Sequence, residues 1–256
     1  MQATVNVTNL TAAAAASTAL TVFAIVNATT ALSARSQDTA ISILSTAAAA
    51  PINMTGDVAQ TITSALSVIS TFALVSNPQA LAQVQGVLTS MALSQAASLA
   101  AALAAQPPGA APPAPMTTTS PTIQTLVQVD PPGGSRLTTQ NLTAPGSPSV
   151  FAPMPANLLP SDSPVVTHFF SLAFDPNPRS ANMSTTGVTR LAFSNPDGSE
   201  IAVANASTPI RFTLPAVNTS TGDQAVCSFW DPEAGAYATH GCAAHAPAAS
   251  ASIHTC

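Results

Sequence analysis

The chain has 256 residues, which is enough for one large domain or two small ones, and its 46% hydrophobic content can supply a core. Only 6% of the residues are charged, against about 25% in ordinary soluble domains, and the net charge is -5. All five basic residues are Arg, and they are scattered along the chain. They cannot form the basic patch that nucleic acid requires, so we expect no nucleic-acid partner.

The first hundred residues predict helices. Segments 10–32 and 37–50 are rich in Ala, and Pro51 ends the second. The stretch 10–34 is uncharged and long enough to cross a bilayer, but Ala and Thr dominate it and Asn27 lies within it. Those residues contribute little transfer free energy, so a buried core helix is the favoured interpretation over a transmembrane span.

Two further helices have clearer signals. Thr55 is a candidate N-cap for the third, whose apolar residues follow a helical stripe: Val58, Ile62, Leu66, Ile69 and Phe72. The fourth begins with Asn77 as cap and Pro78 at the first helical position. It continues through Leu81, Val84, Leu88 and Met91, and Pro107 and Pro108 end it. Four helices with short connections predict a small bundle over 1–106.

A Pro-rich segment, 107–121, is predicted to be an exposed linker. Its prolines are Pro107, Pro108, Pro112, Pro113, Pro115 and Pro121. The hydrophobic period changes from 3.6 to 2 across it, so we expect a domain boundary here, with a β subdomain over 122–256.

The second half predicts short strands with Pro and Gly turns. One face of the first carries Ile123, Thr125, Val127 and Val129, and the most hydrophobic strand covers 165–174. His168 alternates with Phe170 and Leu172, so we expect it to be a strand residue at the edge of the core. Segments 188–194 and 200–204 flank the turn Asn195-Pro196-Asp197-Gly198 and predict a hairpin. Segments 209–214 and 225–230 add two strands. The predicted fold class is α+β, a helical bundle followed by an antiparallel β-sandwich.

N-linked glycans would explain how a protein surface with so few charged residues stays soluble. Asn-x-Ser/Thr sequons account for eight of the twelve Asn: Asn6, Asn9, Asn27, Asn53, Asn141, Asn182, Asn205 and Asn218. We expect Asn141, Asn182 and Asn218 to be the best acceptors, because turn-forming residues lie nearby. Asn27, predicted to be mid-helix, should be the poorest. Codon bias in a GC-rich genome would equally account for the excess of Ala and Pro.

Three cysteines near the C-terminus, Cys227, Cys242 and Cys256, indicate an oxidising compartment. No basic segment typical of a signal peptide follows Met1, so we expect this chain to be an internal segment of a longer protein.

The C-terminal motifs resemble a known family. Asn205-Ala206-Ser207-Thr208-Pro209-Ile210 is followed by Phe212-Thr213-Leu214-Pro215, then by Cys227-Ser228-Phe229-Trp230-Asp231, and then by Gly235, Tyr237, Gly241 and Cys242. This pattern is similar to the GAIN domain with its GPS motif, found in adhesion G-protein-coupled receptors and polycystin-1-like proteins. Family members place a helical subdomain before a β-sandwich. One departure is Tyr237, where the family usually has Trp.

The resemblance implies several properties. It makes 227–256 a GPS-like motif, with Phe229, Trp230, Tyr237 and Gly241 as its core. The family's cysteine pairing implies a Cys227–Cys256 disulfide, with the partner of Cys242 outside this segment. That bond would hold the final strand against the strand with Phe229 and Trp230. The family's self-cleavage residues would follow a fourth cysteine, so none is assigned here; His254 precedes Cys256 and is not given that role. We expect no catalytic residue, no cofactor and no metal.

Other functions have weaker support in the sequence. His240, Cys242, His245, His254 and Cys256 offer zinc ligands, but their spacing fits no standard pattern. No G-x-S-x-G motif supports a hydrolase. The expected function is a juxtamembrane module on the extracellular side of the plasma membrane, including ciliary or flagellar surfaces. It would link an ectodomain to the membrane part of its own chain, in a mechanosensory or adhesive role, and would meet other extracellular glycoproteins or matrix. The alternative is a structural module of a matrix or ciliary fibre.

Overall fold

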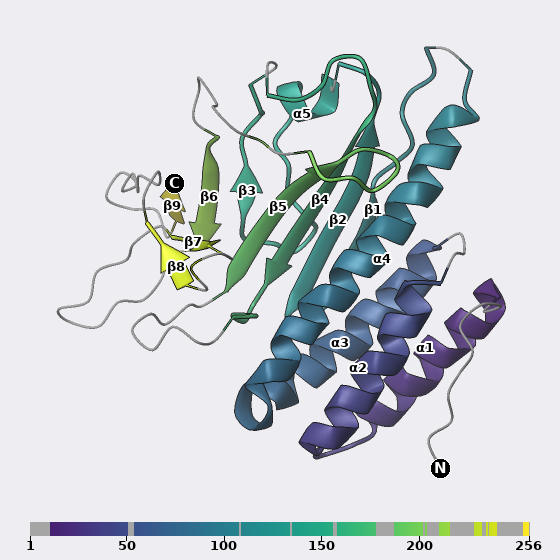
Figure 1. Ribbon diagram of the computed structural model, residues 1–256, viewed down its shortest axis with the longest axis vertical. Helices are drawn as coiled ribbons and strands as arrows, with labels where there is room; N and C mark the ends of the chain where they lie inside the picture. The colour runs from purple at the N-terminus through teal and green to yellow at the C-terminus, as the bar shows by residue number, and fades with distance from the viewer. Residues whose placement is uncertain are drawn as a thin grey trace.

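The computed structural model describes residues 11–50, 54–107, 109–133, 135–155, 158–177, 187–201, 203, 210–215, 228–231, 234, 236–239 and 253–255. These residues form an α+β structure in which helices cover one face of an antiparallel sheet and a smaller sheet covers the other (Figure 1). Among them, every strand follows residue 115 and every helix longer than five residues precedes it.

The first two helices, α1 (Ala12–Asn27) and α2 (Ala34–Ala48), differ from the predicted ranges at their junction. The predicted helix 10–32 ends at Asn27, which is exposed at the helix C-terminus and not in its middle. The predicted helix 37–50 begins three residues early, because the side chain of Ser33 accepts a hydrogen bond from the backbone N–H of Ser36. A serine N-cap satisfies a backbone donor that the helix leaves free, and so fixes where it begins.

The next two helices, α3 (Gly56–Ser76) and α4 (Pro78–Ala104), confirm the sequence signals. Thr55 is the N-cap of α3, and its hydroxyl accepts from the N–H of Val58. Pro78 occupies the start of α4. Asn77 has the cap position but makes no side-chain cap bond, and its Nδ2 donates to Asp38 Oδ1 on α2 at 2.9 Å.

The four helices form two layers. α3 and α4 lie against the sheet, while α1 packs on α3 and α2 on α4 (Figure 1). The predicted stripe of α3 is its buried face, with Ile62, Leu66 and Ile69 fully buried. These residues share one continuous core with the sheet residues Val127, Phe170 and others on the same sheet face. The helical half and the β half are therefore joined by a common hydrophobic core.

The larger sheet, called here the central sheet, has the strand order β1-β2-β4-β5 with all neighbours antiparallel. Its strands are β1 (Met116–Thr119), β2 (Ile123–Asp130), β4 (Val165–Leu172) and β5 (Val188–Ser194). Every residue of β2 and β4 is buried, because helices cover one face and the second sheet covers the other. The predicted turn 195–198 follows β5, with Gly198 at a φ of 87°. Ser194 forms a bridge with Glu200 beyond that turn.

The predicted linker 107–121 was wrong in its second half, where strand β1 lies. The last proline before β1 is Pro115, and the M-T-T-T sequence of the strand pairs with β2. The side-chain amide of Gln60 on α3 makes two hydrogen bonds to the backbone of Thr119, at 2.8 and 3.0 Å. Thr118 is 1% exposed, and its hydroxyl is bonded to those of Thr63 and Thr125. Hydrogen bonding to a helix thus stabilises an edge strand that has little hydrophobic signal.

A second sheet has the order β3-β6-β9, from β3 (Val150–Phe151), β6 (Phe212–Pro215) and β9 (Ile253–Thr255). It faces the central sheet, and the ring of Phe151 meets that of Phe169 edge-on at 5.6 Å. The short helix α5 (Ser135–Thr139) follows β2, and a hairpin of β7 (Phe229–Asp231) and β8 (Ala236–Ala238) completes the described elements. Two facing antiparallel sheets agree with a sandwich arrangement for this half.

By length and composition, α3 and α4 could each cross a membrane. Both are packed in the protein core here, and core helices of soluble proteins have the same composition. The stretch 10–34 was the candidate transmembrane segment. It contains α1, and the buried residues of this helix pack into the same core: Ala15, Ala19, Val22 and Val26.

Candidate functional site

The C-terminal motif that carries the family resemblance lies partly on the β7–β8 hairpin. Trp230 and Tyr237 are directly opposite each other in that antiparallel pair. Phe229 is in β7, opposite Ala238. The structure describes the backbone of Phe229 and Trp230 but not their side chains, so their role as sandwich core stays a prediction. Gly241 lies outside the described residues.

Tyr237 ties this hairpin to the end of the central sheet. Its hydroxyl donates to Asp175 Oδ1 at 2.6 Å, across 62 residues of sequence. Asp175 lies just beyond β4, and the same carboxylate oxygen accepts from the N–H of Asn177 at 2.7 Å. Burial, the hydrogen bond to Asp175 and the negative charge of that carboxylate all raise the pKa of Tyr237 well above its usual value. Where the resemblance implies a tryptophan, this chain has a tyrosine whose hydroxyl is hydrogen-bonded to a carboxylate, whereas an indole can donate only from its ring N–H.

The final strand β9 pairs with β6, placing Thr255 opposite Thr213 and His254 opposite Leu214. Within the described residues the final strand does not make the predicted pairing with the strand holding Phe229 and Trp230: β9 pairs with β6, and β7 pairs with β8. The F-T-L-P segment upstream, not the F-W-D segment, receives the last strand. The second sheet thus joins two pieces of the motif that are about forty residues apart in sequence.

The three predicted disulfide cysteines, Cys227, Cys242 and Cys256, lie outside the described residues. The same holds for six of the sequons: Asn6, Asn9, Asn53, Asn182, Asn205 and Asn218. The two described sequon asparagines, Asn27 and Asn141, are both exposed. Asn141 lies between α5 and the bridge that Leu142 makes with Phe151.

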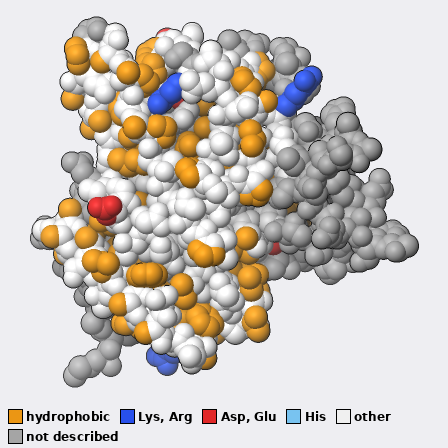
Figure 2. Space-filling view, turned by 180° about the vertical axis from the view of Figure 1, so that it is seen from behind, with side chains coloured by type: hydrophobic (Ala, Val, Ile, Leu, Met, Phe, Trp, Pro, Cys, Tyr) orange, Lys and Arg blue, Asp and Glu red, His pale blue; other side chains and the backbone are white. Residues whose placement is uncertain are grey.

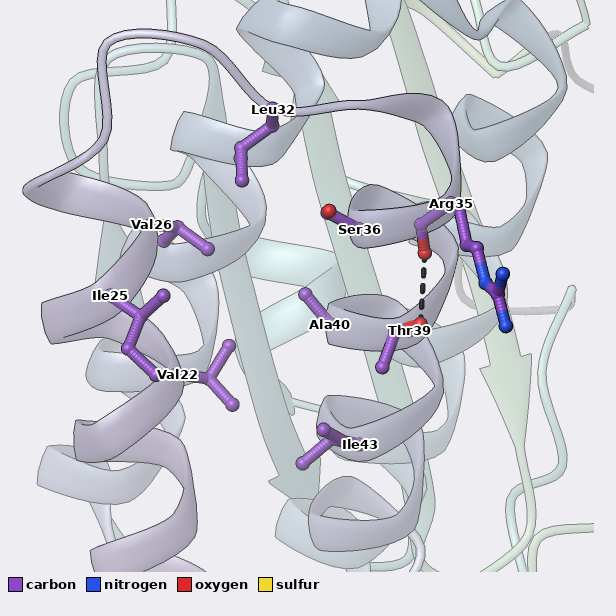
Figure 3. Close-up of a pocket in the computed structure, with 9 residues that line it drawn as sticks. All are labelled: Val22, Ile25, Val26, Leu32, Arg35, Ser36, Thr39, Ala40 and Ile43. Carbon is purple, nitrogen blue, oxygen red and sulfur yellow. Dashed lines mark hydrogen bonds between the residues drawn. The ribbon is translucent and has the colours of Figure 1, made fainter. Parts of the chain in front are cut away.

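A groove of about 350 Å³ lies between α1 and α2, away from the motif (Figure 3). Val22, Val26 and Ala40 form its buried part, while Ile25 and Ile43 are 59% and 37% exposed. Arg35 contributes to the lining, but its guanidinium points away from α1 (Figure 3). Substrate sites combine apolar walls with convergent polar groups. This groove has no such convergence and contains none of the predicted site residues.

The surface agrees with the low charge of the sequence. Figure 2 shows a face on which hydrophobic and uncharged side chains are interspersed and charged ones are few. Within the described residues, no group of three or more His, Cys, Asp or Glu could hold a metal ion. The zinc alternative involved His240, Cys242, His245 and Cys256, which lie outside those residues, and His254, of which only the backbone in β9 is described.

No protein-family model matches the chain, and no curated protein matches its sequence. The functional interpretation therefore depends on the motif residues and on the fold. Sequence reasoning found Tyr237 but missed Asp175, because an acid in a loop 62 residues away gives no local signal.

Proposed function

We propose that this chain is the extracellular, juxtamembrane GAIN-like module of a large polycystin-1-like cell-surface glycoprotein. It links an ectodomain to the membrane part of the same protein and transmits force or adhesion between them. It is not an enzyme, and its partners are the rest of its own chain and other extracellular glycoproteins or matrix.

The observation that supports this most is the pairing of β9 with β6 inside the second sheet. Strand β9 is held in the sheet by main-chain hydrogen bonds to β6, so a force that pulls on β9 acts on these hydrogen bonds together. The order of a helical bundle and then two facing sheets gives further support, because the resemblance implies the same order.

The shared core supports a role in force transmission. Helices α3 and α4 pack directly on the central sheet, and hydroxyl pairs such as Ser67 with Thr122 at 2.8 Å bridge the two halves. A load applied at one half therefore reaches the other through packed side chains and hydrogen bonds, and not through a flexible linker.

Surface labelling tests the location. An antibody raised against the helical half should label intact cells that make the full protein, including their cilia or flagella where present. Permeabilised cells serve as the control, because they report the total amount. Labelling that appears only after permeabilisation would contradict the proposal.

Extraction distinguishes the membrane module from the matrix-fibre alternative. A protein anchored through its own membrane part requires detergent for release, whereas a matrix fibre is released by salt or reductant without detergent. A membrane-spanning run in sequence that follows Cys256 would agree with the first outcome.

A further inference from the structure

His168 is buried between the central sheet and the helices that cover it. His168 lies on the same face of β4 as Phe170 and Leu172, and this face packs against the helices. It is 6% exposed, with Val127 of β2 on one side and Ala192 of β5 on the other. Its Nε2 lies 2.8 Å from the hydroxyl oxygen of Ser194 on β5, which is 4% exposed. The pair joins β4 to the edge strand β5.

The charged group that faces His168 is a cation. Arg190 lies on the same face of β5, opposite Phe170, and its Nη1 donates to Thr89 Oγ1 of α4 at 3.4 Å. Strand β4 has no other charged or titratable residue, and β5 has none besides Arg190.

No anion on the neighbouring elements balances that charge. Helix α4 contains no charged residue over its whole length, α3 has only Asp57 in its first turn, and β1 has none. Asp130 of β2 lies on the face of the sheet opposite to His168, where it forms an ion pair with Arg136. Among the described elements packed around His168, therefore, no negative charge compensates an imidazolium, although the Ser194 hydroxyl can accept a hydrogen bond from it.

Burial, and then the positive charge of Arg190, lower the pKa of His168 to about 4. An unfolded histidine titrates at about 6.5. Between these values the unfolded chain binds a proton that the folded chain does not, so stability is fully present above about pH 6.5 and falls as the pH falls towards 4. Once the pH has fallen below about 4, this difference between the two pKa values has shifted the equilibrium towards the unfolded chain by a factor on the order of a hundred.

We propose that His168 is an acid-responsive latch that holds edge strand β5 against β4 and α4 while it is neutral, and releases β5 when it is protonated. Release occurs at β5 because residues 188–192 of this edge strand are only half-buried, so water reaches the imidazolium there first. The helical layer has no histidine and stays folded. This inference depends on the fold alone and not on the proposed membrane context.

Amide hydrogen exchange of the whole chain tests this, compared at about pH 7 and about pH 5 after correction for the intrinsic pH dependence of exchange. We expect β5 and the turn 195–198 to lose at least tenfold in protection at the lower pH, while α3 keeps its protection. Unchanged protection of β5 in the wild-type protein would overturn the proposal.

Two variants and a control make the assignment specific. His168→Gln keeps a side chain that can bond Ser194 but cannot take the proton, so the pH response of β5 should disappear. Arg190→Met removes the neighbouring cation and should make the response smaller. His254→Gln removes a different histidine and should leave the response unchanged. An equal response in His168→Gln and wild type would assign the effect to another group and overturn the proposal.

Discussion

Arg136 donates from Nε to Asp130 Oδ1 at 2.8 Å, and the carboxylate is fully buried. The same guanidinium donates to the carbonyl oxygens of Pro113 and Val129, while Gln128 donates to the other oxygen of Asp130 at 2.8 Å. One arginine thus joins the Pro-rich segment, the end of β2 and α5, and every carboxylate oxygen has a donor.

Replacing Arg136 by Met should destabilise the fold by about 3–5 kcal/mol, because it leaves a buried carboxylate without a counter-charge. Denaturant unfolding measures this. The double variant Asp130→Asn/Arg136→Met should recover part of the loss, since no buried charge then remains. A loss in the double variant equal to the sum of the losses in Asp130→Asn and Arg136→Met alone would mean that the pair is not coupled.

The chain has one tyrosine, so its absorbance titration reports on Tyr237 alone. The folded protein should form tyrosinate well above the ordinary pKa of about 10, whereas the denatured protein should titrate near that value. Stability supplied by this contact is present below pH 10 and lost as the pH rises above it. Asp175→Asn removes the negative charge and should lower the pKa of Tyr237. A wild-type titration near 10 would show that the contact with Asp175 does not form.

Ser33→Ala should cost about 1 kcal/mol in the free energy of unfolding, because the first turn of α2 loses its cap. Thr46→Ala in the same helix is the matched control. The hydroxyl of Thr46 bonds only the carbonyl of Ser42 one turn earlier, so its removal should be neutral or slightly stabilising. Thermal unfolding measures both, and equal effects would contradict the capping role.

Glycopeptide mass spectrometry of the protein isolated from the cells that make it should find sugar at Asn141, which is exposed in a loop. Asn182 and Asn218 are expected to be occupied as well, and Asn27 least of all. In Asn27-Ala28-Thr29 the hydroxyl of Thr29 bonds the carbonyl of Ile25, which agrees with a poor acceptor. Unmodified asparagine at all eight sequons would remove the argument for a secretory surface.

Peptide mapping without reduction should find Cys227 linked to Cys256. Closing a loop of about 30 residues contributes roughly 3–4 kcal/mol in the loop-entropy model. Cys227→Ser should therefore cause retention of the protein in the secretory pathway. A Cys227–Cys242 bond would contradict the family resemblance.

Local sequence patterns were sufficient to predict those helices and strands in which the same hydrophobic spacing recurs along the whole element. The stripe through Ile62, Leu66 and Ile69 determined α3, and a start at Pro78 determined α4, because burial of one helical face requires that spacing. The strands β2 and β4 were equally clear, since their β-branched and aromatic residues fit a sheet buried on both faces. Tyr237 was identified from its motif alone.

Only the tertiary structure decided the features that depend on a partner far along the chain. Strand β1 has a weak pattern and exists because Gln60 and Thr63 of α3 bond it. The choice of β6 as the partner of β9 depends on which sheet edge is open, and no local sequence encodes that. The bond from Tyr237 to Asp175 likewise arises where strand β8 meets the loop that follows β4. Hydrophobic periodicity reports which face of an element is buried, whereas a single polar contact depends on where two elements meet in space.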